Sequence, residues 1–301
     1  MNYTEQLEKI VDKDNVFEKA LMKDYTSFKV GGPCNRMVFP QNVKQLKNVL
    51  ALLTEEGQPF MLLGNGSDLL VKDEGYNGTF IKLAGDFYNT VINGTVLKSG
   101  AALSLRSLTE VAADAGLSGL EFANGIPGSV GGGIFMNAGA YEGEMRHQIR
   151  QVKVVSRDGS EEKTYLSKDL EMGYRKSILQ KTQEIVLEVE FQLLSEKPEN
   201  IYRRMEELMA IRKSKQPLDI PSAGSFFKRP EGYYAGKLIQ DSGLQGLRVG
   251  GAQVSPLHAG FIVNQDNATA QDILTLMHLI QYTVQDRFGV ELEPEVRIIG
   301  E

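Results

Sequence analysis

The sequence predicts a protein of mixed helices and strands with more than one domain. Segments with apolar side chains at helical spacing alternate with short strand-like runs, and dense glycine turns follow predicted strands. With 301 residues the chain is long enough to form two domains, or three small ones, each with its own core.

In the first part of the chain, helices and strands are distinguished by the spacing of their apolar side chains. Helices are predicted at residues 3–11, 16–22, 43–57 and 103–115, an extended stretch at 25–33, and strands at 59–63, 80–83 and 96–100. Asn-Gly pairs at 77–78 and 93–94 are predicted to be turns between strands.

Beyond residue 150 the sequence predicts strands first, and from Pro198 it predicts helices and turns. Strands at 152–156 and 162–165 flank R-D-G-S, a strong hairpin signal, and 184–193 alternates like a half-buried strand. A charged helix at 200–215, a turn-rich region at 216–230 and a longer helix at 270–288 follow. We therefore place a domain boundary near 195.

Composition excludes several classes of function. The net charge is 33 minus 39, or −6, without a long basic tract, which argues against nucleic-acid binding. No apolar run approaches the roughly 18 residues of a membrane span, and residues 1–24 mix both charges, unlike a secretory signal. One cysteine and three histidines form no metal-ligand cluster. We expect a cytoplasmic protein without a metal.

The most informative stretch is residues 119–141, in which seven of 23 residues are glycine. Between 125 and 133 they read G-I-P-G-S-V-G-G-G, which we interpret as too dense and irregular for a helix or strand interior. Consecutive N–H groups in such a loop can form a nest for phosphate oxygens, and the amide of Asn137 can donate as well. The stretch predicts a cradle for a phosphorylated cofactor; a structural loop without a ligand is the alternative.

A second glycine-rich turn, G-N-G-S-D-L-L at 64–70, also follows a predicted strand. A Rossmann fingerprint beginning at Gly64 would need Gly or Ala at position 69, which is Leu69, and no G-K-S/T follows any glycine cluster. A nucleotide would therefore bind on a different scaffold.

Five separated motifs run in order along nearly the whole chain. They are G-N-G-S-D at 64–68, N-G-I-P-G-S-V-G-G with N-A-G-A-Y at 124–141, G-Y-R-K-S at 173–177, P-S-A-G-S-F-F-K-R-P at 221–230 and E-P-E-V-R at 293–297. Together they resemble the UDP-N-acetylenolpyruvoylglucosamine reductase family, in its shorter type without the substrate-capping tyrosine loop.

The resemblance implies an FAD-binding body of the vanillyl-alcohol oxidase or p-cresol methylhydroxylase type in two subdomains, at 1–83 and 84–195, and an α+β substrate domain at 196–301. It also implies noncovalent FAD, NADPH as reductant, and reduction of UDP-N-acetylglucosamine enolpyruvate to UDP-N-acetylmuramate in peptidoglycan synthesis. No obligate protein partner is implied.

The same resemblance assigns residues to roles. Ser225 would deliver a proton to C2 of the substrate, Arg175 would hold its carboxylate, and Glu295 would polarise or protonate the enolate side. The cofactor residues implied are Gly64, Asn65, Gly66, Ser67, Asp68, Asn124, Gly125, Ile126, Pro127, Gly128, Ser129, Gly131, Gly132, Asn137, Ala138 and Gly139. Candidates for substrate binding are Tyr174, Arg212, Lys215, Lys228, Arg229 and Lys237.

Two residues and two rival functions qualify this assignment. Many family members have Asn where this chain has Arg229, and His258 is expected to be structural. A flavin oxidase on the same body is one rival, although few His and Cys residues are present for a covalent flavin link. A flavin-binding or nucleotide-sugar-binding protein without turnover is the other.

Overall fold

The computed structural model describes residues 3–141 and 143–300, and it divides into two compact units. The first unit is made of Met1–Glu18, Arg36–Asn65 and Gly78–Ile211, and the second of Lys19–Asn35, Gly66–Asn77 and Arg212–Glu301. The three domains predicted at 1–83, 84–195 and 196–301 follow other boundaries, and that division stays a prediction.

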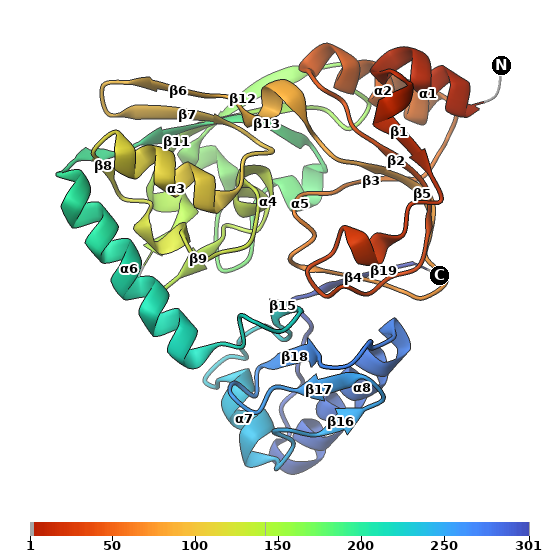
Figure 1. The fold of residues 1–301 in the computed structure, drawn as a ribbon, viewed down its shortest axis with the longest axis vertical. Coiled ribbons are helices and arrows are strands. Elements are labelled where there is room, and N and C mark those ends of the chain that lie inside the picture. Colours follow the sequence, from red (N-terminus) through yellow and green to blue (C-terminus); the bar gives the residue numbers. More distant parts are fainter. Residues whose placement is uncertain (1–2, 142, 301) are drawn as a thin grey trace. The chain divides into compact units, whose positions relative to one another are not determined.

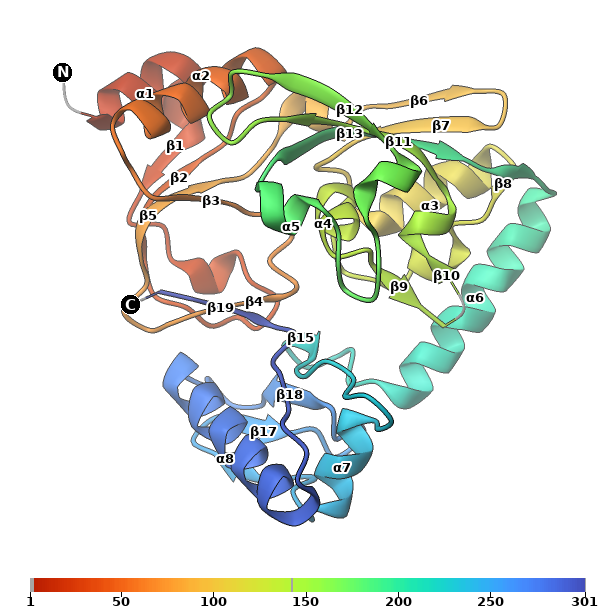
Figure 2. The same cartoon turned by 180° about the vertical axis from the view of Figure 1, so that it is seen from behind.

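The helices and strands are labelled in Figures 1 and 2. The helices are α1 (Tyr3–Val11), α2 (Val43–Glu55), α3 (Leu105–Asp114), α4 (Val130–Phe135), α5 (Leu179–Thr182), α6 (Pro198–Lys215), α7 (Ala235–Asp241) and α8 (Ala270–Phe288). The strands up to residue 150 are β1 (Val16–Glu18), β2 (Cys34–Val38), β3 (Phe60–Leu62), β4 (Leu69–Val71), β5 (Tyr76–Ile81), β6 (Thr90–Asn93), β7 (Val96–Gly100), β8 (Leu117–Ser118), β9 (Gly139–Ala140) and β10 (Gly143–Glu144). The later strands are β11 (Ile149–Val155), β12 (Glu162–Leu166), β13 (Ile185–Gln192), β14 (Leu194–Ser195), β15 (Ser222–Ser225), β16 (Arg248–Val249), β17 (Ala252–Val254), β18 (Phe261–Asn264) and β19 (Arg297–Ile299).

The first unit is built on two sheets. One is antiparallel in the order β12-β11-β13-β7-β6, and α3 and α4 lie on one side of it in both ribbon views (Figures 1 and 2). The other has the order β1-β2-β5-β3, and α1 and α2 lie next to it. One continuous core of buried aliphatic and aromatic side chains, from Leu7 to Leu193, joins these layers.

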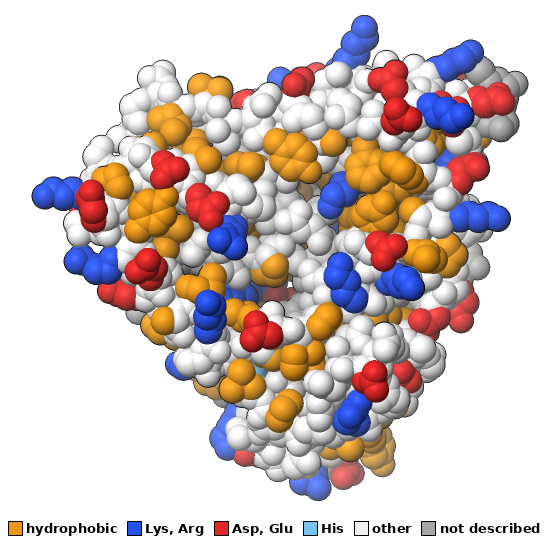
Figure 3. All heavy atoms as spheres, in the orientation of Figure 1, with side chains coloured by type: hydrophobic (Ala, Val, Ile, Leu, Met, Phe, Trp, Pro, Cys, Tyr) orange, Lys and Arg blue, Asp and Glu red, His pale blue; other side chains and the backbone are white. Residues whose placement is uncertain are grey.

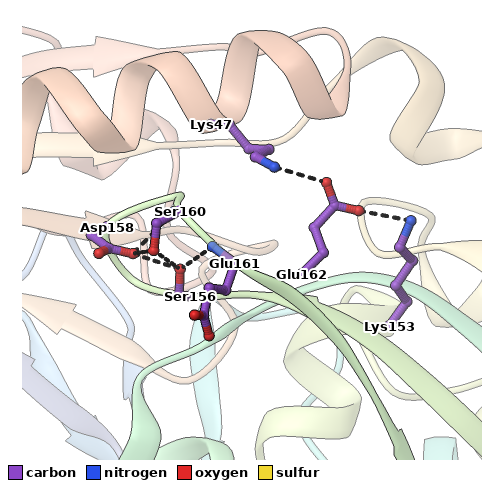
Figure 4. Close-up of polar contacts among 7 residues, drawn as sticks. All are labelled: Lys47, Lys153, Ser156, Asp158, Ser160, Glu161 and Glu162. Carbon is purple, nitrogen blue, oxygen red and sulfur yellow. Dashed lines mark hydrogen bonds and ion pairs between the residues drawn. The ribbon is translucent and has the colours of Figure 1, made fainter.

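The hairpin between β11 and β12 confirms its sequence signal (Figure 4). Asp158 accepts hydrogen bonds from the hydroxyl of Ser156, at 2.5 Å, and from the N–H of Ser160, at 3.0 Å. These bonds lower the pKa of the Asp158 carboxyl to about 2. Lys47 of α2 lies 3.1 Å from Glu162 at the start of β12, so an ion pair links this hairpin to the helix.

The second unit has the antiparallel sheet β15-β18-β17-β16, with α7 and α8 packed against it, and the parallel pair β19-β4. Thr269 and Asp272 form a capping box at the start of α8. The carboxylate of Asp73 accepts the N–H groups of Ala270 and Gln271 at 2.8 and 2.9 Å. The first turn of α8 therefore has acceptors for its N–H groups.

Most predicted elements are confirmed, and the predictions for residues 16–22, 25–33 and 77–78 are wrong wholly or in part. Of the extended stretch predicted at 25–33, residues 25–28 form turns and a bend instead. Residues 16–22 are not a helix, because β1 pairs with Arg36–Val38 of β2 and this tertiary pairing overrides the local apolar spacing. The Asn-Gly pair at 77–78 lies inside β5, whereas the pair at 93–94 forms the expected turn between β6 and β7.

Three general features of the described residues concern their helices, their possible metal ligands and their surface charge. None of their helices is both long enough and apolar enough to cross a membrane. His, Cys, Asp and Glu side chains form no group of three that could hold a metal ion within this part of the chain. On the face drawn in Figure 3, basic and acidic side chains are interspersed.

Candidate active site

The two glycine-rich loops predicted to hold phosphate meet within the first unit. The side-chain amide of Asn65 donates to the carbonyl of Pro127 at 3.3 Å. A Cβ atom on Gly64 would lie 2.6 Å from the hydroxyl oxygen of Ser129, so a larger residue would force that hydroxyl to move. The loops at 64–65 and 127–129 thus form one surface.

The glycine run itself contains a helix, which corrects our expectation of an irregular loop. Residues Val130–Phe135 form α4, and Ser129 is its N-cap. A Cβ on Gly131 would lie 3.1 Å from the Cβ of Ala101, and the Gly131 N–H donates to the Ala101 carbonyl at 2.8 Å. Glycine is used here because the helix packs closely against the backbone of its neighbour, which sequence spacing alone does not reveal.

The backbone N–H groups of this region fall into two sets. Those of Val130, Gly131 and Gly132 donate to Leu103, Ala101 and the Ser129 hydroxyl, so the first turn of α4 is satisfied within the protein. By contrast, no hydrogen bond among residues 3–141 and 143–300 uses the N–H groups of Gly125, Gly128 and Ser129. These three donors, just before α4, fit a bound anion such as the diphosphate of FAD.

Lys82 adds a cation to this surface, although the sequence did not single it out. The residue directly follows β5, and its half-buried ammonium donates to the carbonyl of Gly64 at 2.9 Å. Burial lowers its pKa. A lysine between buried Ile81 and Leu83 is the only signal that the sequence contains.

Asn137, predicted to contact the cofactor, is 1% exposed and uses its side chain inside the protein. Its amide donates to Glu144 at 3.0 Å and to the carbonyl of Gly173 at 2.9 Å, and its oxygen accepts the N–H of Arg146 at 3.1 Å. The amide thus connects the end of the glycine stretch to the segment that carries Arg175. The role of Asn137 toward the cofactor stays a prediction.

The other predicted cofactor residues of this stretch hold the loop in shape. The side chain of Asn124 accepts a hydrogen bond from Thr109 at 3.3 Å, and the carbonyl of Ala138 accepts one from Met145 at 3.0 Å. Gly139 pairs with Glu144 between β9 and β10. Ile126 lies half-buried against the core of the first unit.

Arg175 lies in a tight turn of the first unit. Gly173 and Lys176 exchange backbone hydrogen bonds of 3.0 and 3.2 Å, which leaves Tyr174 and Arg175 at the tip. Arg175 has a φ of +51°, a left-handed conformation that is costly for a residue with a Cβ. Its guanidinium lies 5.2 Å from the centre of the Tyr174 ring, which is exposed.

In the second unit the two remaining catalytic candidates come together although 70 residues separate them. Ser225 is exposed at the end of β15 and pairs with Phe261. The next residue, Phe226, accepts the N–H of Glu295 on its carbonyl at 2.9 Å, and Phe227 forms an antiparallel bridge with Pro294. The motifs at 221–230 and 293–297 therefore form one paired structure.

The second half of the G-N-G-S-D motif lies at the same place in the second unit. The carbonyl of Asp68 accepts the N–H of Arg297 at 3.1 Å, and the parallel pair of β4 with β19 begins there. Gly66 accepts the N–H of Ser27 at 3.0 Å, and Ser67 is half-buried between them.

The cations proposed to bind substrate lie on the second unit, and three of them have contacts there. Lys228 forms an ion pair with Glu293, and Lys237 forms one with Asp241. Arg229 lies 4.0 Å from the centre of the Tyr234 ring. Arg212 and Lys215 occupy the last turn of α6. Exposed ion pairs such as these are weak, and a diphosphate can compete for the ammonium groups.

His258 has the structural role that the sequence predicts. Its Nδ1 accepts the N–H of Gly260 at 3.1 Å, and its ring meets Phe261 edge-on at 4.8 Å. Burial lowers its pKa, which favours the neutral ring.

Comparisons with known proteins agree with this arrangement. Residues 216–299 match the family model of the C-terminal domain of UDP-N-acetylenolpyruvoylglucosamine reductase, and residues 34–165 match that of an FAD binding domain. A UDP-N-acetylenolpyruvoylglucosamine reductase of Alkaliphilus oremlandii is 47% identical over 295 residues, which cover 98% of this chain and 97% of the relative. One of Geobacillus kaustophilus is 46% identical over 300 residues, which cover 99% and 97%.

A solved structure extends the match to the fold. The crystal structure of MurB, the reductase of Thermus caldophilus, superposes with a TM-score of 0.81 at 40% identity and covers 93% of this chain and 98% of that one. With the FAD-domain match, it confirms the predicted α+β body of the vanillyl-alcohol oxidase or p-cresol methylhydroxylase type. The chain therefore belongs to the UDP-N-acetylenolpyruvoylglucosamine reductase family, whose members are FAD-containing oxidoreductases of peptidoglycan synthesis.

Proposed function

We propose that this chain reduces the enolpyruvyl ether of UDP-N-acetylglucosamine enolpyruvate to UDP-N-acetylmuramate, with NADPH as the reductant, in the cytoplasm. The observation that supports it best is the pairing in the second unit, where Phe226 bonds to Glu295 and brings the Ser225 and Glu295 motifs together. A proton donor and a carboxylate on two segments that are joined next to them by backbone contacts suit the protonation of a carbanion-like centre.

The residues of the first unit fit FAD as the cofactor. Its diphosphate carries negative charge, and the unused N–H groups of Gly125, Gly128 and Ser129 together with the ammonium of Lys82 supply positive potential around Gly64. The remaining loop residues of this unit, 64–65 and 124–139, would contribute backbone and packing. When bound, FAD would supply hydride transfer between NADPH and C3 of the enolpyruvyl group.

Three side chains would complete the reaction. Addition of a hydride at C3 leaves negative charge at C2, which spreads into the substrate carboxylate. The planar guanidinium of Arg175 holds that carboxylate in two hydrogen bonds and stabilises the charge. The Ser225 hydroxyl donates its proton to C2, and Glu295 polarises or protonates the enolate side. Tyr174 and the cations of the second unit would orient the nucleotide diphosphate.

An anaerobic titration tests the whole proposal. Purified yellow protein should bleach with NADPH and regain its colour when UDP-N-acetylglucosamine enolpyruvate is added without oxygen. UDP-N-acetylmuramate should then appear in amounts equal to the NADPH consumed, measured by mass spectrometry. Colour that returns only with oxygen would indicate a flavin oxidase, and a flavin that NADPH does not bleach would indicate a binding protein; both results contradict the proposal.

A further inference from the structure

We infer that Gln180 is a positioning residue for Arg175, because its side-chain amide joins the arginine turn, residues 173–176, to the end of α4. The inference rests on the proposed role of Arg175 in holding the substrate carboxylate. Gln180 lies on α5, outside the motifs by which the family is recognised in this sequence.

The side-chain amide of Gln180 binds both the arginine turn and the end of α4. It donates to the carbonyl of Arg175 at 3.0 Å and to the carbonyl of Phe135 at 3.2 Å. Phe135 is the last residue of α4, where helix carbonyls lack partners within the helix. The two N–H groups of one planar amide therefore set the distance between Arg175 and the helix that follows the phosphate loop.

Two neighbouring side chains make the connection stiff. The hydroxyl of Ser177, which is fully buried, donates to the same Phe135 carbonyl at 2.7 Å. The amide of Asn137 binds the carbonyl of Gly173 at 2.9 Å, on the other side of the turn. Side chains thus bind the carbonyls of Gly173 and Arg175 in the arginine turn, and Ser177 anchors the chain directly after it. Of these side chains, that of Gln180 binds Arg175 itself.

The backbone of Arg175 needs this support. A non-glycine residue at a φ of +51° is strained and is held there by its surroundings. Removal of the bond to the Arg175 carbonyl lets the residue relax toward negative φ, which redirects its side chain. A misplacement of about 1 Å can cost on the order of 100-fold in rate.

The test compares Gln180→Met with Gln183→Met. Both replace a glutamine amide by an apolar side chain of similar length, but the amide of Gln183 donates only within its own segment, to the Gln180 carbonyl. We expect Gln180→Met to bind FAD and to be reduced by NADPH like the parent protein. Its reoxidation by UDP-N-acetylglucosamine enolpyruvate should slow by about 10- to 100-fold, and that of Gln183→Met should not.

A double-mutant cycle identifies the route of the effect. In an Arg175→Ala background, Gln180→Met should slow reoxidation by less than about twofold further, because the arginine through which it acts is gone. An equal loss in both backgrounds, or parent-like reoxidation by Gln180→Met, would overturn the inference. Gln180→Asn keeps the amide on a shorter side chain and serves if the Met variant folds poorly, with the same expected pattern.

A measurement without substrate separates this inference from the proposed function. Hydrogen exchange of the Gly173 and Lys176 N–H groups, followed by mass spectrometry on the FAD-bound protein, should quicken in Gln180→Met and not in Gln183→Met. Unchanged exchange would overturn the positioning role. Failure of the parent protein to be reoxidised by the enolpyruvyl substrate would instead contradict the proposed function and leave the exchange result standing.

Discussion

The candidate residues of the first unit and those of the second unit are held in shape by different kinds of interaction. In the first unit, buried side chains bind backbone carbonyls: Asn137 and Ser177 are 1% and 0% exposed, and each donates to a main-chain oxygen. In the second unit, backbone pairs with backbone, as between Phe226 and Glu295, and the side chain of Ser225 is left exposed.

This difference predicts which substitutions should affect the reaction with substrate and which should affect cofactor binding or loop geometry. Where side chains form the scaffold, a single substitution alters the geometry of the loop that carries it. Where strand pairing forms the scaffold, a reactive side chain can be replaced without loss of the pairing. Substitutions in the second unit should therefore remove chemistry and spare the fold, whereas those in the first unit should change cofactor binding or geometry.

The largest effect is expected at Ser225, in the second unit. Ser225→Ala should leave flavin reduction by NADPH intact and slow reoxidation by the enolpyruvyl substrate about 1000-fold, because the proton donor is lost. Stopped-flow absorbance of the flavin measures both steps. Ser222→Ala, in the same strand, is the matched control and should behave like the parent protein. Substrate reoxidation at a parent-like rate would show that Ser225 is not the donor.

A smaller effect is expected when the carboxylate of Glu295 is replaced by an amide. Glu295→Gln should slow reoxidation by about 100-fold, because the amide cannot supply the charge that the enolate side needs. Glu293→Gln, two residues earlier and paired with exposed Lys228, should change it little. Circular dichroism should show the same folded structure for both variants. Equal rates for the two would mean that Glu295 has no special role.

The sequence predicts those parts of the fold whose signals are local. The helices at 43–57 and 103–115 were predictable because side chains of Asn42 and Ser104 cap them and their apolar spacing is regular. The glycine at 131 inside α4 was not, because the reason for it is a close approach to Ala101, which is distant in sequence. Strand β1 likewise depends on its partner β2.

In the candidate site, too, local motifs were predictable from the sequence and contacts between distant segments were not. The motifs predict which residues matter, but the contact between Phe226 and Glu295 is a backbone hydrogen bond between distant segments, which no local pattern encodes. Lys82 and Gln180 lie outside every motif, and their importance arises from the carbonyls of Gly64 and Arg175 that they contact. Supporting residues such as these are therefore recognised only from the residues that they contact in the folded protein.

In the first unit, Lys82→Met tests the proposed binding of FAD near Gly64. We expect about tenfold weaker FAD binding, because the cation near Gly64 is lost in a half-buried place. Titration of the apoprotein by flavin fluorescence measures it. Lys98→Met, at a surface lysine paired with Glu190, is the control. Equal affinities would mean that Lys82 does not face the anionic part of FAD.

The pH dependence of FAD binding tests whether the positive charge of Lys82 favours the anionic cofactor. Burial lowers the pKa of Lys82 in the apoprotein, so its ammonium is lost at a lower pH than that of an ordinary lysine. An anionic ligand favours the protonated form, and affinity should therefore fall as pH rises through that pKa. Lys82→Met should remove this dependence, and a variant that keeps it would place the titrating group elsewhere.

The smallest effect is expected in the second unit, away from its reactive side chains. Asp73→Ala removes the acceptor of the Ala270 and Gln271 N–H groups at the start of α8. Loss of such a cap should lower the free energy of unfolding by about 1–2 kcal/mol. Asp266→Ala, at an exposed carboxylate just before the helix, is the control. Urea unfolding of both measures the difference. The rate of substrate reoxidation should not change, because backbone pairing rather than this cap holds Ser225 and Glu295; a matching loss of rate would mean that α8 helps to position them.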